Sequence, residues 1–432
     1  DLARAGTFGN ALRRLQDMMH RIFTLSLLLG LAGSLAAETK FDATDWPNWR
    51  GLTSDGQAKF VKGLPTEWSK IKNVVWKTPI PGRGHSTPTL VGERIYLATA
   101  EEDEMYQSVL CINKADGKLV WETRVHEGQF AVGLNKHASH AGTAVVHDGE
   151  RLYVNFVIGN QAYASALGLD GKLLWQKPIG KFKVHQGYGS SPMVFGDIVV
   201  VKADTKIGGV ICGLDKKTGR EIWRQERPKL PNYTTPVVIE AAGKQQMVFC
   251  GCELVTSLDP LTGKKLWEVP GSTEECVSTL VTDGTHIFVS GGWPKNHTAA
   301  IVADGSGKVA WRNTARVYVP SMLIRGGFLY VTMDAGFAIC WNAKTGKQQW
   351  KERLGGAFYT SPVMAGNRIY GTNLAGKTFV FEANPDEFKL LATNQLGDEV
   401  YASPIVSGDR LYLRVAFKDE ERQEFLYAIG TK

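Results

Sequence analysis

A short phrase repeats six times along the chain and constrains its fold more than any other feature. The phrase is a glycine, then Lys or Arg, then two variable residues and a tryptophan. Its copies are Gly117–Trp121, Gly171–Trp175, Gly219–Trp223, Gly263–Trp267, Gly307–Trp311 and Gly346–Trp350. Glycine takes positive φ without steric cost, so each copy predicts a tight hairpin turn followed by a strand that carries an inward Trp.

The spacing of the copies points to one architecture. Successive tryptophans of the phrase lie 54, 48, 44, 44 and 39 residues apart, and strand-built repeats of about 40–50 residues are typical of propeller blades. An apolar second strand follows a turn glycine eight times: Arg94–Leu97, Arg151–Val154, Asp197–Val200, Gln246–Phe249, His286–Val289, Phe328–Val331, Arg368–Gly371 and Arg410–Leu413. The sequence therefore predicts an all-β, eight-bladed propeller of four-stranded antiparallel blades over residues 74–432.

The two ends of this region complement each other. Val74–Lys77, with Trp76, has the pattern of a tryptophan strand, but no blade precedes it, and the last blade ends after Ile429 without such a strand. Docking the first segment on the last blade closes the ring and removes two exposed sheet edges. Residues 38–73 form an irregular lead-in, whose tryptophans we expect to pack on the outside of the propeller.

The N-terminus has the pattern of a signal peptide. A short positive region, Met18-Met19-His20-Arg21, precedes the apolar run Ile22–Leu31 and the small-x-small site Ser34-Leu35-Ala36. An apolar run of about ten residues is too short to span a membrane. We expect residues 1–37 to be an upstream segment plus signal peptide, and the mature chain to be periplasmic or extracellular, without a membrane span.

The charged residues exclude one class of partner. The chain has 50 Lys and Arg against 43 Asp and Glu, a net charge of +7, and no basic stripe interrupts the blades. This balance predicts a soluble protein, which we expect to be a monomer, and gives no support for nucleic-acid binding.

The six cysteines permit two interpretations. Three fall on apolar third strands, which favours buried free thiols: Cys111, Cys212 and Cys340. Cys250 and Cys252 are expected on one face of one strand, with Cys276 in the next connection. A Cys-x-Cys pair can be redox-active or bind metal, but no His or Cys cluster has ligand spacing. We therefore expect structural thiols and no metal site.

The repeated phrase, read most clearly as Asp215-Lys-Lys-Thr-Gly-Arg-Glu-Ile-Trp223, resembles the pyrroloquinoline-quinone-like (PQQ-like) propeller repeat, and the resemblance covers residues 74–432. The family implies tryptophans that pack between neighbouring blades, here Trp76, Trp121, Trp175, Trp223, Trp267, Trp311 and Trp350. Two functional branches share the fold. One is the quinoprotein dehydrogenases, which hold PQQ and calcium in the central funnel, and the other is non-catalytic envelope propellers similar to the BamB type of outer-membrane assembly protein.

The dehydrogenase branch makes demands that the sequence does not meet. It expects adjacent cysteines over the cofactor and large insertions between blades, and neither occurs here. Its calcium is held by Glu, Asn and Asp side chains. Asp204, Asp334 and Asn373 lie in loops between second and third strands, but they match no motif of the family and are interpreted as turn residues.

A ligand site is expected where the blade-to-blade connections converge on the channel. Just before the inner strands, five of which begin with Ser-Pro or Thr-Pro, these connections carry aromatic or basic residues: Arg83, His85, Lys136, His140, Tyr188, Tyr233, Tyr318, Tyr359 and Tyr401. Tyr is enriched at recognition sites, and positive charge favours an acidic partner. The alternative is that the tyrosines only plug the channel by stacking on their neighbours.

These features together predict an exported, non-catalytic scaffold. We expect it to bind an envelope protein or an extracellular polymer at the funnel mouth, with no catalytic residues and no cofactor. The alternative is a PQQ-dependent dehydrogenase that oxidises alcohols or sugars with PQQ and calcium.

Overall fold

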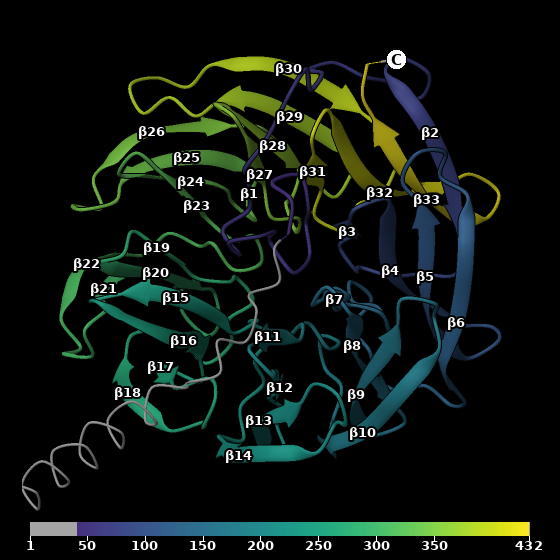
Figure 1. The fold of residues 1–432 in the computed structure, drawn as a ribbon. Helices are drawn as coiled ribbons and strands as arrows, with labels where there is room; N and C mark the ends of the chain where they lie inside the picture. Colours follow the sequence, from purple (N-terminus) through teal and green to yellow (C-terminus); the bar gives the residue numbers. More distant parts are fainter. Residues whose placement is uncertain (1–40, 432) are drawn as a thin grey trace, which may run out of the picture. The chain divides into compact units, whose positions relative to one another are not determined.

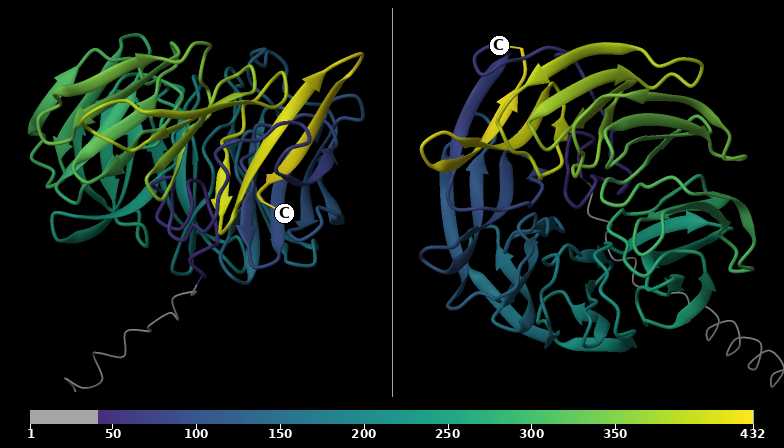
Figure 2. Two further views of the ribbon diagram at one scale, coloured as in Figure 1. Left: turned by 90° about the horizontal axis from the view of Figure 1, so that it is seen from above. Right: turned by 180° about the vertical axis from the view of Figure 1, so that it is seen from behind.

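The computed structural model describes residues 41–431, and all of the regular structure in this range is β-strand. Eight sheets surround a central channel (Figures 1 and 2). The predicted all-β, eight-bladed propeller is confirmed. The predicted signal peptide lies outside the described residues. Within the described range, no helix is long and apolar enough to cross a membrane.

Each blade is a four-stranded antiparallel sheet. The blades are numbered 1 to 8 in the order of their inner strands along the chain, and the strands of the blades are given from the channel outwards. The inner strands are β3 (Thr89–Val91), β7 (Val146–His147), β11 (Met193–Phe195), β15 (Val237–Ala241), β19 (Val281–Thr282), β23 (Leu323–Arg325), β27 (Val363–Ala365) and β31 (Ile405–Ser407). The second strands are β4 (Arg94–Glu101), β8 (Arg151–Ile158), β12 (Ile198–Ala203), β16 (Lys244–Gly251), β20 (His286–Gly291), β24 (Phe328–Thr332), β28 (Arg368–Thr372) and β32 (Arg410–Lys418). The third strands are β5 (Tyr106–Asn113), β9 (Gln161–Gly168), β13 (Gly209–Asp215), β17 (Leu254–Leu258), β21 (His297–Val302), β25 (Phe337–Asn342), β29 (Lys377–Glu382) and β33 (Arg422–Ile429). The outer strands are β6 (Leu119–Glu127), β10 (Leu173–Lys181), β14 (Glu221–Arg227), β18 (Lys265–Pro270), β22 (Val309–Asn313), β26 (Gln348–Arg353), β30 (Leu390–Gln395) and, in blade 8, β2 (Val74–Ile80).

The N-terminal strand closes the ring, as the sequence predicts. β2 pairs antiparallel with β33, in a register that sets Val74 opposite Ile429 and Ile80 opposite Glu424. Figure 1 shows β2, coloured purple, beside the yellow strands of the C-terminal blade. The pairing gives the last blade a fourth strand from the other end of the chain, so β33 is not left as an open edge.

The tryptophan series joins each blade to the next. Nε1 of Trp76 donates a hydrogen bond to the Lys114 carbonyl in the turn of blade 1 (2.9 Å). The same bond to the next blade's turn recurs at Trp121, Trp175, Trp223, Trp311 and Trp350. The indole lies on the turn glycine, so a Cβ on Gly263 would come within 2.4 Å of Trp223. The glycine of the phrase therefore serves both the turn, at φ +69°, and the close approach of the neighbouring indole.

Hydroxyl groups link the blades around the channel. Each accepts a hydrogen bond of 2.9–3.0 Å from a backbone N–H of the preceding blade's connection; the hydroxyls belong to Ser191, Thr235, Ser321, Ser361 and Ser403. In four Ser-Pro or Thr-Pro pairs, the hydroxyl thus ties two blades together while the proline directly precedes the inner strand.

Part of the lead-in crosses the channel, so the prediction that its tryptophans pack outside the propeller is wrong for Trp46 and Trp49. Trp46 pairs its backbone with Leu90 of β3, and Nε1 of Trp49 donates to Oγ1 of Thr279 beside blade 5 (2.8 Å). β1 (Gln57–Ala58) adds a parallel strand to β27, and Trp68 stacks on Tyr370. In Figure 1 the purple segment crosses the centre of the ring.

Candidate functional site

A cavity of about 820 Å³, which we call the funnel, lies where the connections between blades converge. Six of the nine residues predicted to surround the funnel mouth line it: His85, Tyr188, Tyr233, Tyr318, Tyr359 and Tyr401. Five of these rings, those of His85, Tyr188, Tyr233, Tyr359 and Tyr401, lie two or three residues before a Ser-Pro or Thr-Pro pair. Thr279 and Trp49 lie in the same lining.

The other three predicted residues do not line the funnel. Nη2 of Arg83 donates to the backbone carbonyl of Lys136 (2.9 Å), whose own side chain is exposed. The His140 ring stacks on Phe130, with centroids 4.2 Å apart. Burial there lowers the pKa of His140.

On one side of the funnel, aromatic rings contact one another across three blades. His85 stacks on Tyr401 with centroids 4.1 Å apart, and Nδ1 of His137 lies 2.8 Å from the Tyr401 hydroxyl. Tyr359 contacts both His137 and Tyr401. Burial, and then the charge of Arg83, hold the pKa of His85 well below its usual value, so this imidazole is neutral at pH 7.

On the opposite side, a buried carboxylate joins the tyrosines. The Tyr318 hydroxyl donates to Oε2 of Glu275 (2.9 Å), and Nδ1 of His185 lies 3.4 Å from the Tyr233 hydroxyl. Burial, and then the nearby Glu275 charge, raise the pKa of both tyrosines, so both remain neutral donors. Sequence reasoning missed Glu275. The sequence feature that could have indicated Glu275 is the connection before the inner strand of blade 5, Thr273–Cys276, which has no aromatic residue at this register.

The tyrosines differ in how far they face the funnel. Tyr188 and Tyr233 are 7% and 4% exposed, and the Tyr188 hydroxyl donates to the Lys202 carbonyl within blade 3. Tyr318, Tyr359 and Tyr401 are half-buried. The first two fill the wall of the channel, whereas the last three present ring surface to the cavity.

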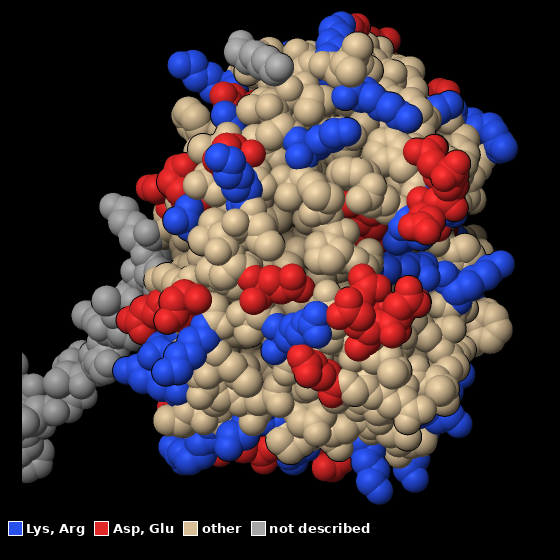
Figure 3. Space-filling model, turned by 90° about the vertical axis from the view of Figure 1, so that its right-hand side faces the viewer, with Lys and Arg blue, Asp and Glu red and all other residues tan. Residues whose placement is uncertain are grey.

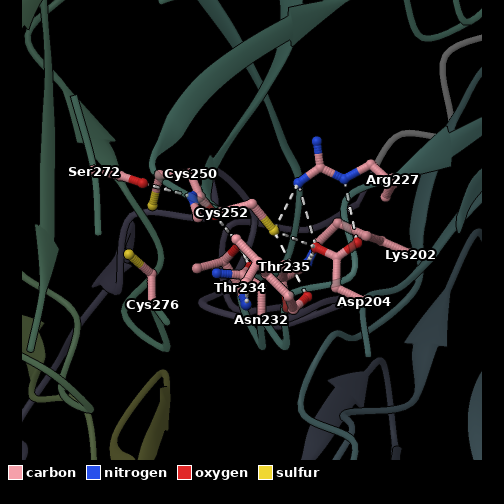
Figure 4. A network of polar contacts seen from close by, with 12 residues as sticks. Lys202, Asp204, Arg227, Asn232, Thr234, Thr235, Cys250, Cys252, Ser272 and Cys276 are labelled. Atoms are coloured by element: carbon pink, nitrogen blue, oxygen red, sulfur yellow. Dashed lines mark hydrogen bonds and ion pairs between the residues drawn. The ribbon is translucent and has the colours of Figure 1, made fainter. Parts of the chain in front are cut away.

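A buried ion cluster contacts the connection that carries Tyr233, and Figure 4 shows this cluster from close by. Asp204 contacts Nζ of Lys202 (3.1 Å) and Nε of Arg227 (3.2 Å), and Lys202 also donates to Oδ1 of Asn232 (3.1 Å). Asn232 directly precedes Tyr233, and its backbone bridges to Asp204. The cluster therefore ties the connection that carries Tyr233 to blade 3.

Two of the three predicted turn residues also hold neighbouring connections. Both carboxylate oxygens of Asp334 accept backbone N–H bonds, from Tyr318 (2.7 Å) and Val319 (3.2 Å), and burial raises its pKa. Nδ2 of Asn373 donates to the Gly355 carbonyl (3.2 Å). Throughout residues 41–431, no group of three or more His, Cys, Asp or Glu side chains is placed to hold a metal ion.

Cys250 and Cys252 do not share a strand face, contrary to the prediction. β16 ends at Gly251, and Cys252 lies in the following turn at φ +56°, with its sulfur 3.7 Å from Nη2 of Arg227. Figure 4 shows the Cys250 sulfur on the other side, toward Cys276. All six cysteines are buried and free. Burial raises the pKa of Cys252 to about 12, as expected of an unreactive thiol.

A second, wider groove of about 1400 Å³ lies between blades 8 and 1. Acidic residues of two loops, Glu101–Asp103 and Asp419–Glu421, line it with basic residues such as Lys70 and Lys77. Figure 3 shows the corresponding side of the molecule, where Lys and Arg are interspersed with Asp and Glu and form no continuous basic stripe. This face therefore lacks the electrostatic pattern of a nucleic-acid interface.

The family described as "Outer membrane protein assembly factor BamB" matches residues 50–186, 107–303 and 294–385. The protein of that name from Burkholderia pseudomallei (strain K96243) is 24% identical over 374 residues, 75% of this chain and 92% of its own. The crystal structure of BamB from Moraxella catarrhalis is similar with a TM-score of 0.60 at 12% identity, over 82% of this chain and 99% of that one. A europium-containing methanol dehydrogenase gives a TM-score of 0.68 at 12% identity, over 90% and 98%. These structural likenesses show the fold alone, whereas the sequence match spans most of the propeller: the chain belongs to the BamB-like family of PQQ propellers.

Proposed function

We propose that this protein is a non-catalytic scaffold of the cell envelope that binds a partner protein at the funnel mouth. The observation that carries the proposal is the half-buried set Tyr318, Tyr359 and Tyr401, which presents aromatic surface and hydroxyls in a preformed cavity. Such side chains anchor partners at low entropic cost. Membership of the BamB-like family and the predicted signal peptide support the envelope location.

The carboxylates that line the funnel favour partner binding over PQQ-dependent oxidation. These carboxylates, Glu275 and Asp334, are each held by other groups, one by the Tyr318 hydroxyl and the other by backbone amides. They do not form the clustered oxygen set that a calcium ion needs. The dehydrogenase alternative has a direct test, because a quinoprotein mixed with PQQ and calcium would reduce an artificial electron acceptor.

The proposal is tested by changing the accessible tyrosines. Tyr359→Ala combined with Tyr401→Ala should weaken binding of the partner from envelope extract at least thirtyfold, because the loss of even one such anchor costs about 2 kcal/mol. The control is Tyr163→Ala, a half-buried tyrosine on β9 that does not line the funnel. A protein retained by the control and lost by the double variant supports the proposal. Equal capture by both variants contradicts it.

A further inference from the structure

Glu275 is a buried carboxylate that is only half satisfied. It lies in the connection between β18 and β19, is 4% exposed and lines the funnel. Its backbone N–H donates to the Trp293 carbonyl, and Oε2 accepts the Tyr318 hydroxyl. Oε1 accepts no hydrogen bond from any described residue. Nδ1 of His185, at 3.9 Å, is the one basic atom of the described chain within 4.0 Å.

This arrangement leaves one oxygen available to a ligand. Oε1 is not among the buried, unpaired polar atoms of the described chain, so water can reach it, and an ionised carboxylate oxygen is a strong acceptor. Here Tyr318 fixes the carboxylate in one orientation and leaves Oε1 open. A ligand cation that donates to Oε1 would form a charge-assisted hydrogen bond in a partly desolvated site, where such bonds are strong.

The walls beside Glu275 also suit a cation. Tyr233, Tyr318 and Trp293 line the same cavity, and Trp293 is 54% exposed. Aromatic faces attract ammonium and guanidinium groups. The protein already shows this at the rim, where the guanidinium of Arg316 lies 5.2 Å from the centroid of the Tyr318 ring.

Among the carboxylates that line the funnel, Glu275 is the one that has an oxygen without a hydrogen bond from a described residue. Asp334 is satisfied by two backbone N–H groups. The other charged side chains of the lining, Lys206 and Arg316, are cations exposed at the surface. We propose that the funnel takes a cationic side chain, arginine or lysine, from the partner protein, with Glu275 as its counter-ion. This inference rests on the proposed function and names the chemical group that the partner inserts.

The test compares two acetylated, amidated tripeptides, Ala-Arg-Ala and Ala-citrulline-Ala, by saturation-transfer NMR on the purified full chain at up to 10 mM peptide. Citrulline keeps the shape of arginine and removes the charge. The arginine peptide should bind at least tenfold more tightly. Glu275→Gln should weaken binding of the arginine peptide at least tenfold. The glutamine retains an acceptor for the Tyr318 hydroxyl, so the melting temperature should be preserved. The matched control is Glu240→Gln, on the exposed face of β15.

Three results would overturn the inference: equal affinity for the two peptides, unchanged binding of the arginine peptide by Glu275→Gln, or no binding of the arginine peptide at 10 mM. Failure here is separable from failure of the proposed function. If the double tyrosine variant loses the partner while Glu275→Gln captures it as well as the unmodified protein does, the scaffold function stands and the cationic anchor is wrong.

Discussion

Replacing Asp204 with Asn should destabilise the propeller strongly. The Asp204 carboxylate is buried and lies within 3.1–3.2 Å of nitrogen atoms of Lys202 and Arg227, whose side chains are also buried. Asn keeps the shape but leaves two buried cations without an anion. Removing one partner of a buried pair costs about 3–5 kcal/mol. With an unfolding entropy of about 2.1 cal/mol/K per residue over the described chain, the melting temperature should fall by about 4–6 °C.

The effect should depend on pH. Burial raises the pKa of Asp204, but the charges of Arg227 and Lys202 outweigh burial and hold that pKa below its usual value. A carboxyl group with a lowered folded-state pKa stabilises the protein above its unfolded pKa of about 3.9. This contribution is lost as the pH falls through the folded-state pKa. The difference between the unmodified protein and Asp204→Asn should therefore be complete at pH 7 and shrink below about pH 4.

Thermal unfolding at pH 7 and pH 3 measures both effects. Asp103→Asn is the control, because this exposed carboxylate has no ion pair within the described residues. Adding Lys202→Met to Asp204→Asn removes one uncompensated cation and should recover part of the loss. The reasoning is refuted if Asp204→Asn melts within about 1 °C of the unmodified protein at pH 7, or if the control loses as much.

Two further predictions concern the closure and docking of the blades. Gly263→Ala should cost about 1–3 kcal/mol more than Gly243→Ala, because both glycines have φ +69° but a Cβ would meet Trp223 only at Gly263. Urea unfolding of the two variants measures the difference, and equal losses would contradict the docking role of the turn. Deleting Val74–Ile80 should lower stability by several kcal/mol and promote self-association through the exposed edge of β33, as followed by thermal unfolding and light scattering. An unchanged melting temperature would contradict the closure.

The blade pattern could be predicted because its causes are local. A turn glycine, an alternating strand and a following Trp are set by backbone sterics and side-chain period within a few residues. The orphan strand Val74–Lys77 and the incomplete last blade could be matched because each lacks what the other supplies. Cys252 shows the limit of local reasoning, since a single turn residue at positive φ reversed the expected direction of its side chain.

The candidate site was predictable only in part. The register of residues before the inner strands located Tyr318, Tyr359 and Tyr401 correctly, because a repeated connection places repeated positions at one end of the channel. The same register could not show that Phe130 holds His140 away from the funnel. Nor could it show that Glu275 takes part, since the bond from Tyr318 joins residues 43 positions apart.

The sequence by itself therefore determined the β-propeller, its eight blades and the strand that closes it, because periodicity and turn sterics act within one repeat. The tertiary structure alone decided the path of the lead-in through the channel, the buried cluster around Asp204 and the open oxygen of Glu275. These features arise where side chains from different blades meet at the channel axis. Their burial and partners depend on which blades the closed ring sets side by side, and no local pattern encodes that.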